Sequence, residues 1–182
     1  MMKRRTLKKA VILPLGLIVI LAVWQVQRMK SAQTPQQGAQ SATVPAVVAV
    51  NEWEAVQLGK TEALRYLLED GGVNVNATND LGSTLLLEAS ALAPAEMVEM
   101  LVDHGADLEA QFPTNGCTPL HWAVMSGRTV VVRTLLAHGA DPLATDHEGL
   151  NPLQYLSVIP ELDSPAIRKL LEEAQRNHQG DH

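Results

Sequence analysis

Cysteine and histidine residues supply the first candidates for chemistry. Cys117 and His121 are four residues apart, a spacing that could join a thiol and an imidazole as metal ligands or as a nucleophile and its base. A structural zinc site takes about four ligands, and no second pair follows at a matching spacing. We therefore expect neither a metal site nor a catalytic residue at this position.

Two further patterns could carry chemistry. His104 and His138 stand in identical His-Gly-Ala-Asp contexts, so they could line one edge as ligands of a metal or haem, but a histidine near a helix C-terminus is ordinary capping chemistry. Gly59-Lys60-Thr61 resembles the end of a phosphate-binding loop, yet the earlier glycine is missing. We expect a protein that is not an enzyme and that holds no cofactor.

The elements that position these residues are short helices. Thr118 can cap a helix, and Pro119 falls at the first helical position, where an N–H would be unpaired anyway. Apolar residues recur at helical spacing until Gly127, and a second helical run ends at Gly139. Neither helix can bury its apolar side alone, so residues 116–149 need neighbours of the same kind.

This stretch resembles an ankyrin repeat. The matching residues are Gly116, Thr118, Pro119, Leu120, His121, Ala123, Gly127 and His138-Gly139-Ala140-Asp141. The resemblance implies a solenoid of helix pairs joined by hairpin loops, and a protein-binding module without catalysis. It also implies that His121 is the structural histidine of the family and that Cys117 occupies a variable hairpin position.

The pattern repeats along the chain. The apolar pairs that begin at Leu67, Leu101, Leu135 and Leu170 follow one another at intervals of 34, 34 and 35 residues. We therefore predict an all-α ankyrin-repeat solenoid of about four repeats over residues 51–176, followed by a tail at 177–182 that frays with the preceding residues from Gln175. The repeats are residues 51–78, 79–112, 113–145 and 146–176.

Charge is divided unevenly along the 182 residues. Residues 1–30 contain seven of the 14 Lys and Arg residues and none of the 20 Asp and Glu residues. The remaining residues, 31–182, therefore contain seven basic and 20 acidic side chains, a net charge of −13. A domain this acidic is repelled by a phosphate backbone, so we expect no nucleic acid partner and a protein partner with a basic or mixed-charge surface.

The N-terminal segment indicates export. A basic head at residues 1–9 precedes an uncharged, almost wholly apolar run at residues 10–26. An uncleaved transmembrane signal anchor and a cleaved signal peptide both have these parts, but no good cleavage site follows the run. The excess of cations before the run places the N-terminus in the cytoplasm and the rest outside, at the periplasmic side of a bacterial inner membrane, as a single-pass protein. Residues 27–50, rich in Gln, Ala, Ser, Thr and Pro, predict a flexible linker.

The family resemblance also implies where a partner binds. Hairpin tips and the exposed side of the first helix of each repeat form the concave recognition surface. Carried over to this chain, the partner-binding residues are Leu58, Asp80, Leu81, Ser83, Leu92, Thr114, Asn115, Met125, His147, Glu148 and Leu150. Trp122 can belong either to the core or to the rim of this surface.

These features together predict a monomeric, membrane-tethered binding protein. Its role could be that of an immunity protein or inhibitor that blocks a toxic effector. It could instead be an accessory protein for the maturation of a periplasmic enzyme or for delivery of its haem or metal cofactor.

Overall fold

The repeat region folds as four consecutive pairs of helices. The computed structural model describes residues 50–70, 72–159 and 162–180. The helices are α2 (Glu52–Gln57), α3 (Thr61–Glu69), α4 (Leu85–Leu92), α5 (Ala95–Asp103), α6 (Pro119–Met125), α7 (Thr129–Ala137), α8 (Pro152–Val158) and α9 (Pro165–Gly180). Within these residues the β pairing is limited to an isolated bridge between Thr78 and Thr84, so the all-helical prediction is confirmed for this part of the chain.

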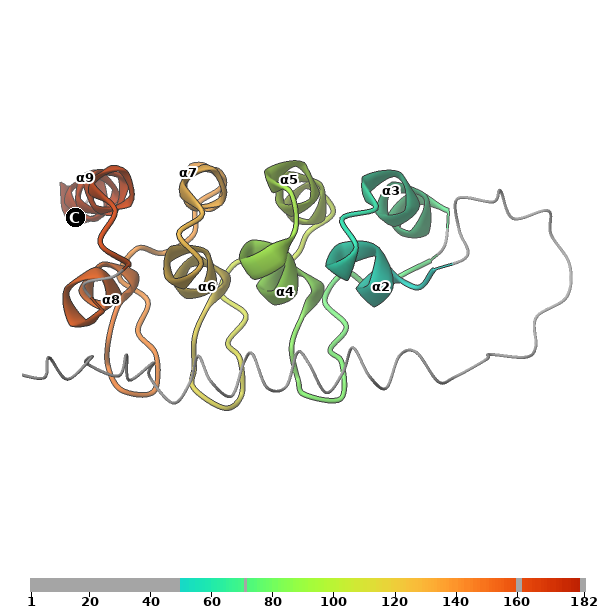
Figure 1. The fold of residues 1–182 in the computed structure, drawn as a ribbon, viewed down its shortest axis with the longest axis horizontal. Helices are drawn as coiled ribbons and strands as arrows, with labels where there is room; N and C mark the ends of the chain where they lie inside the picture. Colours follow the sequence, from blue (N-terminus) through green and yellow to red (C-terminus); the bar gives the residue numbers. More distant parts are fainter. Residues whose placement is uncertain (1–49, 71, 160–161, 181–182) are drawn as a thin grey trace, which may run out of the picture. The chain divides into compact units, whose positions relative to one another are not determined.

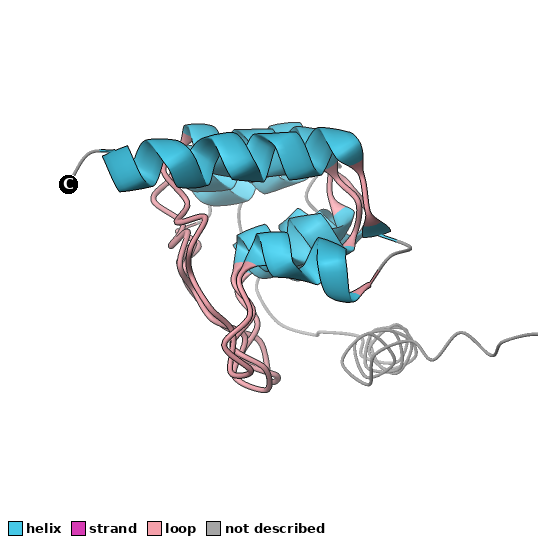
Figure 2. Ribbon diagram, turned by 90° about the vertical axis from the view of Figure 1, so that its left-hand side faces the viewer, coloured by secondary structure: helices cyan, strands magenta, loops and turns pink. Residues whose placement is uncertain are grey.

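The helices form two layers (Figure 1). One row contains the inner helices α2, α4, α6 and α8, and the other contains the outer helices α3, α5, α7 and α9. Figure 2 shows the hairpin loops projecting away from both layers at one end of the inner helices. Each inner helix packs against its neighbours in the row, as α4 does against α2 and α6. Stacking therefore buries the apolar surface that one short pair would leave exposed.

Each inner helix begins after a capping residue, and at α6 this is the predicted Thr118. Asn51 Oδ1 accepts a hydrogen bond from Glu54 N at 2.8 Å, and Thr84 Oγ1 accepts one from Leu87 N at 3.3 Å. Helix α8 begins with a reciprocal pair, in which Asn151 Oδ1 accepts from Gln154 N and Gln154 Oε1 accepts from Asn151 N. Such caps satisfy backbone N–H groups that have no partner inside the helix.

The core is mostly aliphatic, because the whole chain contains only six aromatic residues. Leucines of the inner helices and branched residues of the outer helices fill the space between the layers, with Leu86, Leu101, Leu120 and Leu135 at most 1% exposed. The uncertain placement of Trp122 is resolved in favour of the core, because its side chain is buried.

The hairpins of neighbouring repeats contact one another. His147 N donates a hydrogen bond to Asn115 O at 2.9 Å, which joins the hairpin of the third repeat to that of the fourth. A Cβ atom added at Gly116 would meet His147, and one added at Gly82 would meet Pro113. Both glycines have a positive φ and no room for a Cβ atom, so glycine is required there for close approach as well as for the turn.

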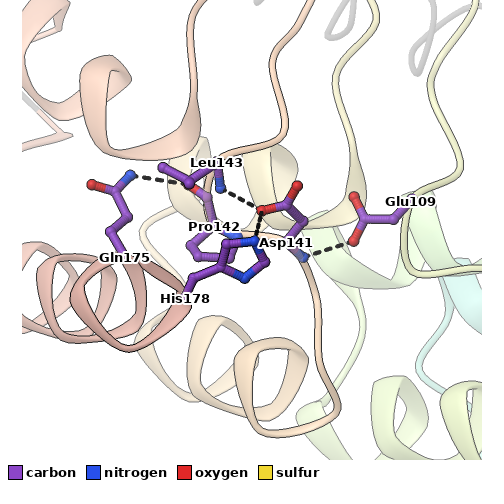
Figure 3. Close-up of polar contacts among 6 residues, drawn as sticks. All are labelled: Glu109, Asp141, Pro142, Leu143, Gln175 and His178. Carbon is purple, nitrogen blue, oxygen red and sulfur yellow. Dashed lines mark hydrogen bonds and ion pairs between the residues drawn. The ribbon is translucent and has the colours of Figure 1, made fainter. Parts of the chain in front are cut away.

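The C-terminal helix differs from the other outer helices. Helix α9 has 16 residues, whereas α3, α5 and α7 have nine each. The prediction that the chain frays from Gln175 is therefore wrong for residues 175–180, which continue α9 past the expected repeat boundary at 176. The physical reason is a set of contacts with the loop that ends the third repeat, drawn in Figure 3.

These contacts close the outer edge of the array. Glu109 Oε1 accepts a hydrogen bond from Asp141 N at 2.8 Å, which joins the loop of the second repeat to that of the third. Within the described residues, no equivalent loop of the fourth repeat packs on the loop of the third repeat. Side chains of α9 make contacts with that loop instead. Gln175 Nε2 donates to Pro142 O at 3.0 Å, and His178 Nε2 lies 4.0 Å from Asp141 Oδ1 (Figure 3). The last two turns of α9 thus act as a cap on the third repeat.

The expected membrane-spanning helix at residues 10–26 lies outside the described residues. None of the helices described between residues 50 and 180 is both long and apolar enough to span a bilayer.

Candidate functional site

The hairpin and the inner helix of the last three repeats are joined by one side-chain pair in each repeat. The pairs are Asn79 with Glu88, Phe112 with Trp122, and Asp146 with Tyr155. In each case the helix residue lies four positions after the residue that caps the helix. These pairs fix the hairpins relative to the inner helices and so shape the surface between them. Sequence reasoning missed this set, although the shared position after the cap could have identified it.

The pair of the second repeat contains a carboxylate that is largely removed from water. Asn79 Nδ2 donates to Glu88 Oε1 at 2.7 Å, and Gln57 Nε2 donates to Glu88 Oε2 at 3.4 Å. Burial raises the pKa of Glu88, and the two hydrogen bonds offset only part of that effect. The charged form of Glu88 is therefore less favourable in the folded protein than in the unfolded chain.

Replacing Glu88 by glutamine should reveal this cost as a pH-dependent gain in stability. Because the folded pKa is raised, the contribution of Glu88 to stability is present at low pH and is lost as the pH rises above about 4.5 and through the folded pKa. We expect Glu88→Gln and the unaltered protein to have similar free energies of unfolding near pH 4. The variant should become the more stable of the two toward pH 7, as measured by urea denaturation across this range.

A suitable control is Glu99→Gln, which changes an exposed carboxylate on α5. Because the Glu99 side chain is exposed, its replacement should change the free energy of unfolding little. A Glu88→Gln curve that runs parallel to the unaltered one would contradict the assigned direction of the pKa shift.

The pair of the third repeat is aromatic. The rings of Phe112 and Trp122 meet edge to face with their centroids 5.6 Å apart, and both side chains are buried. This hairpin is one residue longer than the others, since Phe112 N bonds Cys117 O across five positions. The corresponding bonds in the other two hairpins, Asn79 N to Ser83 O and its equivalent in the fourth repeat, cross four positions.

The pair of the fourth repeat belongs to a partly buried polar cluster around Tyr155. The Tyr155 hydroxyl donates to Asp146 Oδ2, and Cys117 Sγ lies 3.4 Å from the same hydroxyl. Burial alone would raise the pKa of Asp146, but the bonds from Tyr155 and from the backbone N–H groups of Leu150 and Glu148 outweigh it and lower that pKa. The cluster therefore holds a stable carboxylate whose oxygens are already engaged.

Cys117 is not an activated thiol. Its side chain is fully buried, and burial raises its pKa to about 11, so the thiol stays protonated at neutral pH. The resemblance implied a variable hairpin position for Cys117, and the structure shows that its side chain is buried there.

His121 is the structural histidine that the resemblance implied. Thr118 N donates to His121 Nδ1 at 3.2 Å, which makes Nδ1 an acceptor, and Nε2–H donates to Leu150 O at 3.0 Å in the next repeat. Burial lowers the pKa of His121, so the ring is neutral. With both nitrogens engaged, His121 has no lone pair to offer a metal. No group of three His, Cys, Asp or Glu residues in the described part of the chain is arranged to hold a metal ion.

The two equivalent histidines at the outer edge cap helices. His104 Nδ1 donates to Met100 O, and His138 Nδ1 donates to Thr134 O, both at 2.8 Å. His138 Nε2 also lies 3.8 Å from Asp103. Each ring thus uses its Nδ1–H to bond a carbonyl oxygen in the last turn of its own helix, as the capping interpretation predicts.

The structure divides the expected partner-binding residues into three groups. The exposed residues are Leu58, Asp80, Leu81, Leu92, Thr114, His147 and Glu148. Asn115 and Leu150 are partly buried, and Asn115 also uses its Oδ1 to accept a bond from Cys117 N. Ser83 and Met125 are buried, so the expectation that their side chains face a partner is wrong for this conformation. For Ser83 the reason is that it closes its hairpin against Asn79.

We define the hairpin face as the seven exposed residues of this set together with Val158. Val158 lies in the last turn of α8, three residues after Tyr155, and is 61% exposed. It was not among the expected residues.

The hairpins and inner helices lack positive charge. Residues 51–58, 79–92, 112–126 and 146–159 contain six carboxylates and no Lys or Arg. The carboxylates are Glu52, Glu54, Asp80, Glu88, Asp146 and Glu148. The Lys and Arg residues of the array lie in the turns after α2 and α6 or on the outer helices. The hairpin face is therefore a mixed apolar and acidic surface.

Stacked helix pairs with projecting hairpins define a helical repeat protein. The family description "Ankyrin repeats (3 copies)" matches residues 53–146, and the chain belongs to the ankyrin-repeat family. Members of this family are generally non-enzymatic interaction modules.

Similar proteins share only the repeat region with this chain. It is 39% identical over 100 residues to the E3 ubiquitin-protein ligase Ufd4 of Drosophila melanogaster, which covers 55% of this chain and 4% of the ligase. It is 34% identical over 111 residues to the putative ankyrin repeat protein FPV031 of Fowlpox virus, which covers 60% of this chain and 32% of the viral protein. The similarity thus extends over a small part of each relative.

Proposed function

We propose that this chain is a non-enzymatic module that captures one protein partner through the hairpin face. The observation that carries the proposal is the composition of that face, where Leu58, Leu81 and Leu92 are 58%, 37% and 44% exposed and where the carboxylates of Asp80 and Glu148 are also exposed. Exposed apolar side chains with a charged rim are typical of protein interaction surfaces. The hairpins are held to the inner helices by side-chain pairs, so little conformational entropy is lost when a partner binds.

We further propose that the module is tethered at the periplasmic side of a bacterial inner membrane. This rests on the sequence, namely the apolar run at residues 10–26 between a basic head and a polar linker. Alkaline extraction of membranes, with protease digestion of intact spheroplasts, tests both anchoring and orientation. Recovery of a shortened chain in the soluble periplasmic fraction would support the cleaved-signal alternative instead.

Within this setting, we propose that the module acts as an immunity protein or inhibitor of a toxic effector. A rigid acidic surface fits this role because it can cover a basic surface of another protein and speed the encounter electrostatically. The direct test is cross-linked capture from periplasmic extract with the full chain, followed by an activity assay of the captured protein. Unchanged activity of a captured effector would reject inhibition while leaving capture intact.

Reversing charge on the hairpin face should weaken capture. The double variant Asp80→Lys with Glu148→Lys replaces two exposed carboxylates by two ammonium groups and raises the net charge by four. We expect the affinity for the captured partner to fall by about tenfold or more, because the rim would then repel a basic surface. Thermal unfolding should change little, since neither side chain is buried.

The matched control is Glu69→Lys with Glu99→Lys, which changes the net charge equally but on the outer helices α3 and α5. Equal affinities for the two double variants would show that the partner does not bind at the hairpin face.

A further inference from the structure

Within the described residues, the first repeat has no preceding repeat to cover it. Its helices α2 and α3 stand at one end of the two rows (Figure 1). Leu67 is the seventh residue of α3, the place that Leu101 holds in α5 and Leu135 in α7. Those two leucines are fully buried, whereas Leu67 is partly exposed. Leu171, the seventh residue of α9 in the last repeat, is fully buried too, so a following repeat is not what covers this position.

Trp53 of α2 shows the same difference. It lies two residues after the cap, as Leu86 and Leu120 do in α4 and α6. Those leucines are at most 1% exposed because an inner helix packs on each side of theirs, whereas Trp53 is partly exposed, as is Leu153 in the last repeat. We define the end face as Trp53 and Leu67, whose counterparts in the interior repeats are buried.

The segment that enters α2 is not suited to a hairpin like those of the later repeats. Gly82, Gly116 and Gly149 each lie two residues before a cap and have a positive φ. Ala49 holds the same place before the cap Asn51. A positive φ is unfavourable for alanine because its Cβ atom crowds the following carbonyl oxygen. The residues before α2 must therefore follow a different course.

Residues 43–49, which lie outside the described residues, read TVPAVVA and favour an extended course. They include neither charge nor glycine, and valine and proline both favour extended backbone. Seven extended residues span about 23 Å, enough to cross two helices packed about 10 Å apart. Val50, the next residue, is partly buried and packs against the core. The segment thus reaches the first repeat with an apolar side chain already lying against it.

We propose that residues 43–49 lie extended across the end face and cover it in place of a preceding repeat. Side chains of an extended segment alternate between its two sides, so Val44 and Val48 share the side of Val50 and face the array. Val47 faces water. The cover is separate from the hairpin face. It closes the end face to a second copy of the chain and leaves residues 27–42 as the linker.

Thiol labelling of the full chain in detergent tests this alternation. The single variants Val47→Cys and Val48→Cys are treated with a maleimide under native conditions, and the native Cys117 does not compete because it is fully buried. We expect Val48→Cys to react at least about tenfold more slowly than Val47→Cys, since a covered side chain reacts only when the segment opens locally. Ser41→Cys, in the linker, should react as fast as Val47→Cys.

Amide hydrogen exchange measures what the cover does for the first repeat. Val48→Asp should lower the protection of α2 and α3 by about tenfold, because a carboxylate is costly to place on an apolar face and the segment would be displaced. Val47→Asp is the matched control and should leave that protection unchanged. Neither variant should alter the protection of α8 and α9, which belong to the other end of the array.

Equal labelling of Val47→Cys and Val48→Cys, or equal protection of α2 in the two aspartate variants, would overturn the inference. Slow labelling of Val48→Cys that becomes fast on dilution would also overturn it, because a second copy would then be the cover. None of these results would affect capture at the hairpin face, which the charge reversal at Asp80 and Glu148 tests separately.

Discussion

Replacing Leu135 by alanine should lower the free energy of unfolding by about 2–5 kcal/mol. Leu135 is fully buried in α7, which packs against α5, α6 and α9. Truncation removes buried methyl groups and leaves a cavity among four helices that caps and hydrogen bonds hold in place, so the site can relax only in part. Urea denaturation followed by circular dichroism measures the change.

Val130→Ala is the control in the same helix, because Val130 is 62% exposed. It should change the free energy of unfolding by about 0.5 kcal/mol or less. If Leu135→Ala destabilised the protein no more than Val130→Ala, the packing of α7 between the second and fourth repeats would be incorrect.

Replacing Gly116 by alanine should lower the free energy of unfolding by about 2–4 kcal/mol, from backbone strain together with overpacking. Gly116 has a φ of 74°, and a Cβ atom there would lie 2.5 Å from His147 Cδ2 and 2.8 Å from His147 N. The backbone N of His147 cannot swing aside as a side chain can, because it is bonded to Asn115 O. The fourth hairpin must therefore shift, which should loosen α8 and α9.

The change is best measured against Gly127→Ala. Gly127 has a φ of 66° but no neighbouring atom within 4 Å of an added Cβ, so only the conformational cost of about 1–2 kcal/mol applies. Hydrogen exchange should show the loss of protection in Gly116→Ala concentrated in the fourth repeat. Equal destabilisation by the two variants would mean that the hairpins do not stack as described.

Local chemistry made the repeat array predictable from the sequence. A cap such as Thr118, a proline at the next position and a glycine after the second helix have the same meaning wherever they occur, because they act on the adjacent backbone. Their recurrence at nearly constant intervals gave the number of helix pairs and the assignment of His121. The end of α9 was harder to predict from the sequence. Its last turns depend on contacts of Gln175 and His178 with a loop more than 30 residues earlier in the chain.

The surface residues were harder to predict than the fold. A family position describes an average repeat, and Ser83 and Met125 depart from that average through the local length and packing of their own repeats. The hairpin of the third repeat is one residue longer, and its Phe112 packs edge to face against Trp122. Pairs of this kind arise from side chains nine or ten residues apart across a turn, so helical or strand periodicity does not reveal them.

The junctions between repeats have a consequence for the order of the units. Gln57 of the first repeat donates to Glu88 of the second, whereas Cys117 of the third contacts Tyr155 of the fourth. A chain that lost residues 79–112 would place Gln57 beside Trp122, the residue equivalent to Glu88, where the amide finds no carboxylate. These contacts thus depend on the particular residues of the adjoining repeat. The four units share one architecture, but the side-chain contacts differ from junction to junction. Deleting or exchanging a unit would therefore remove contacts that identical repeats would keep.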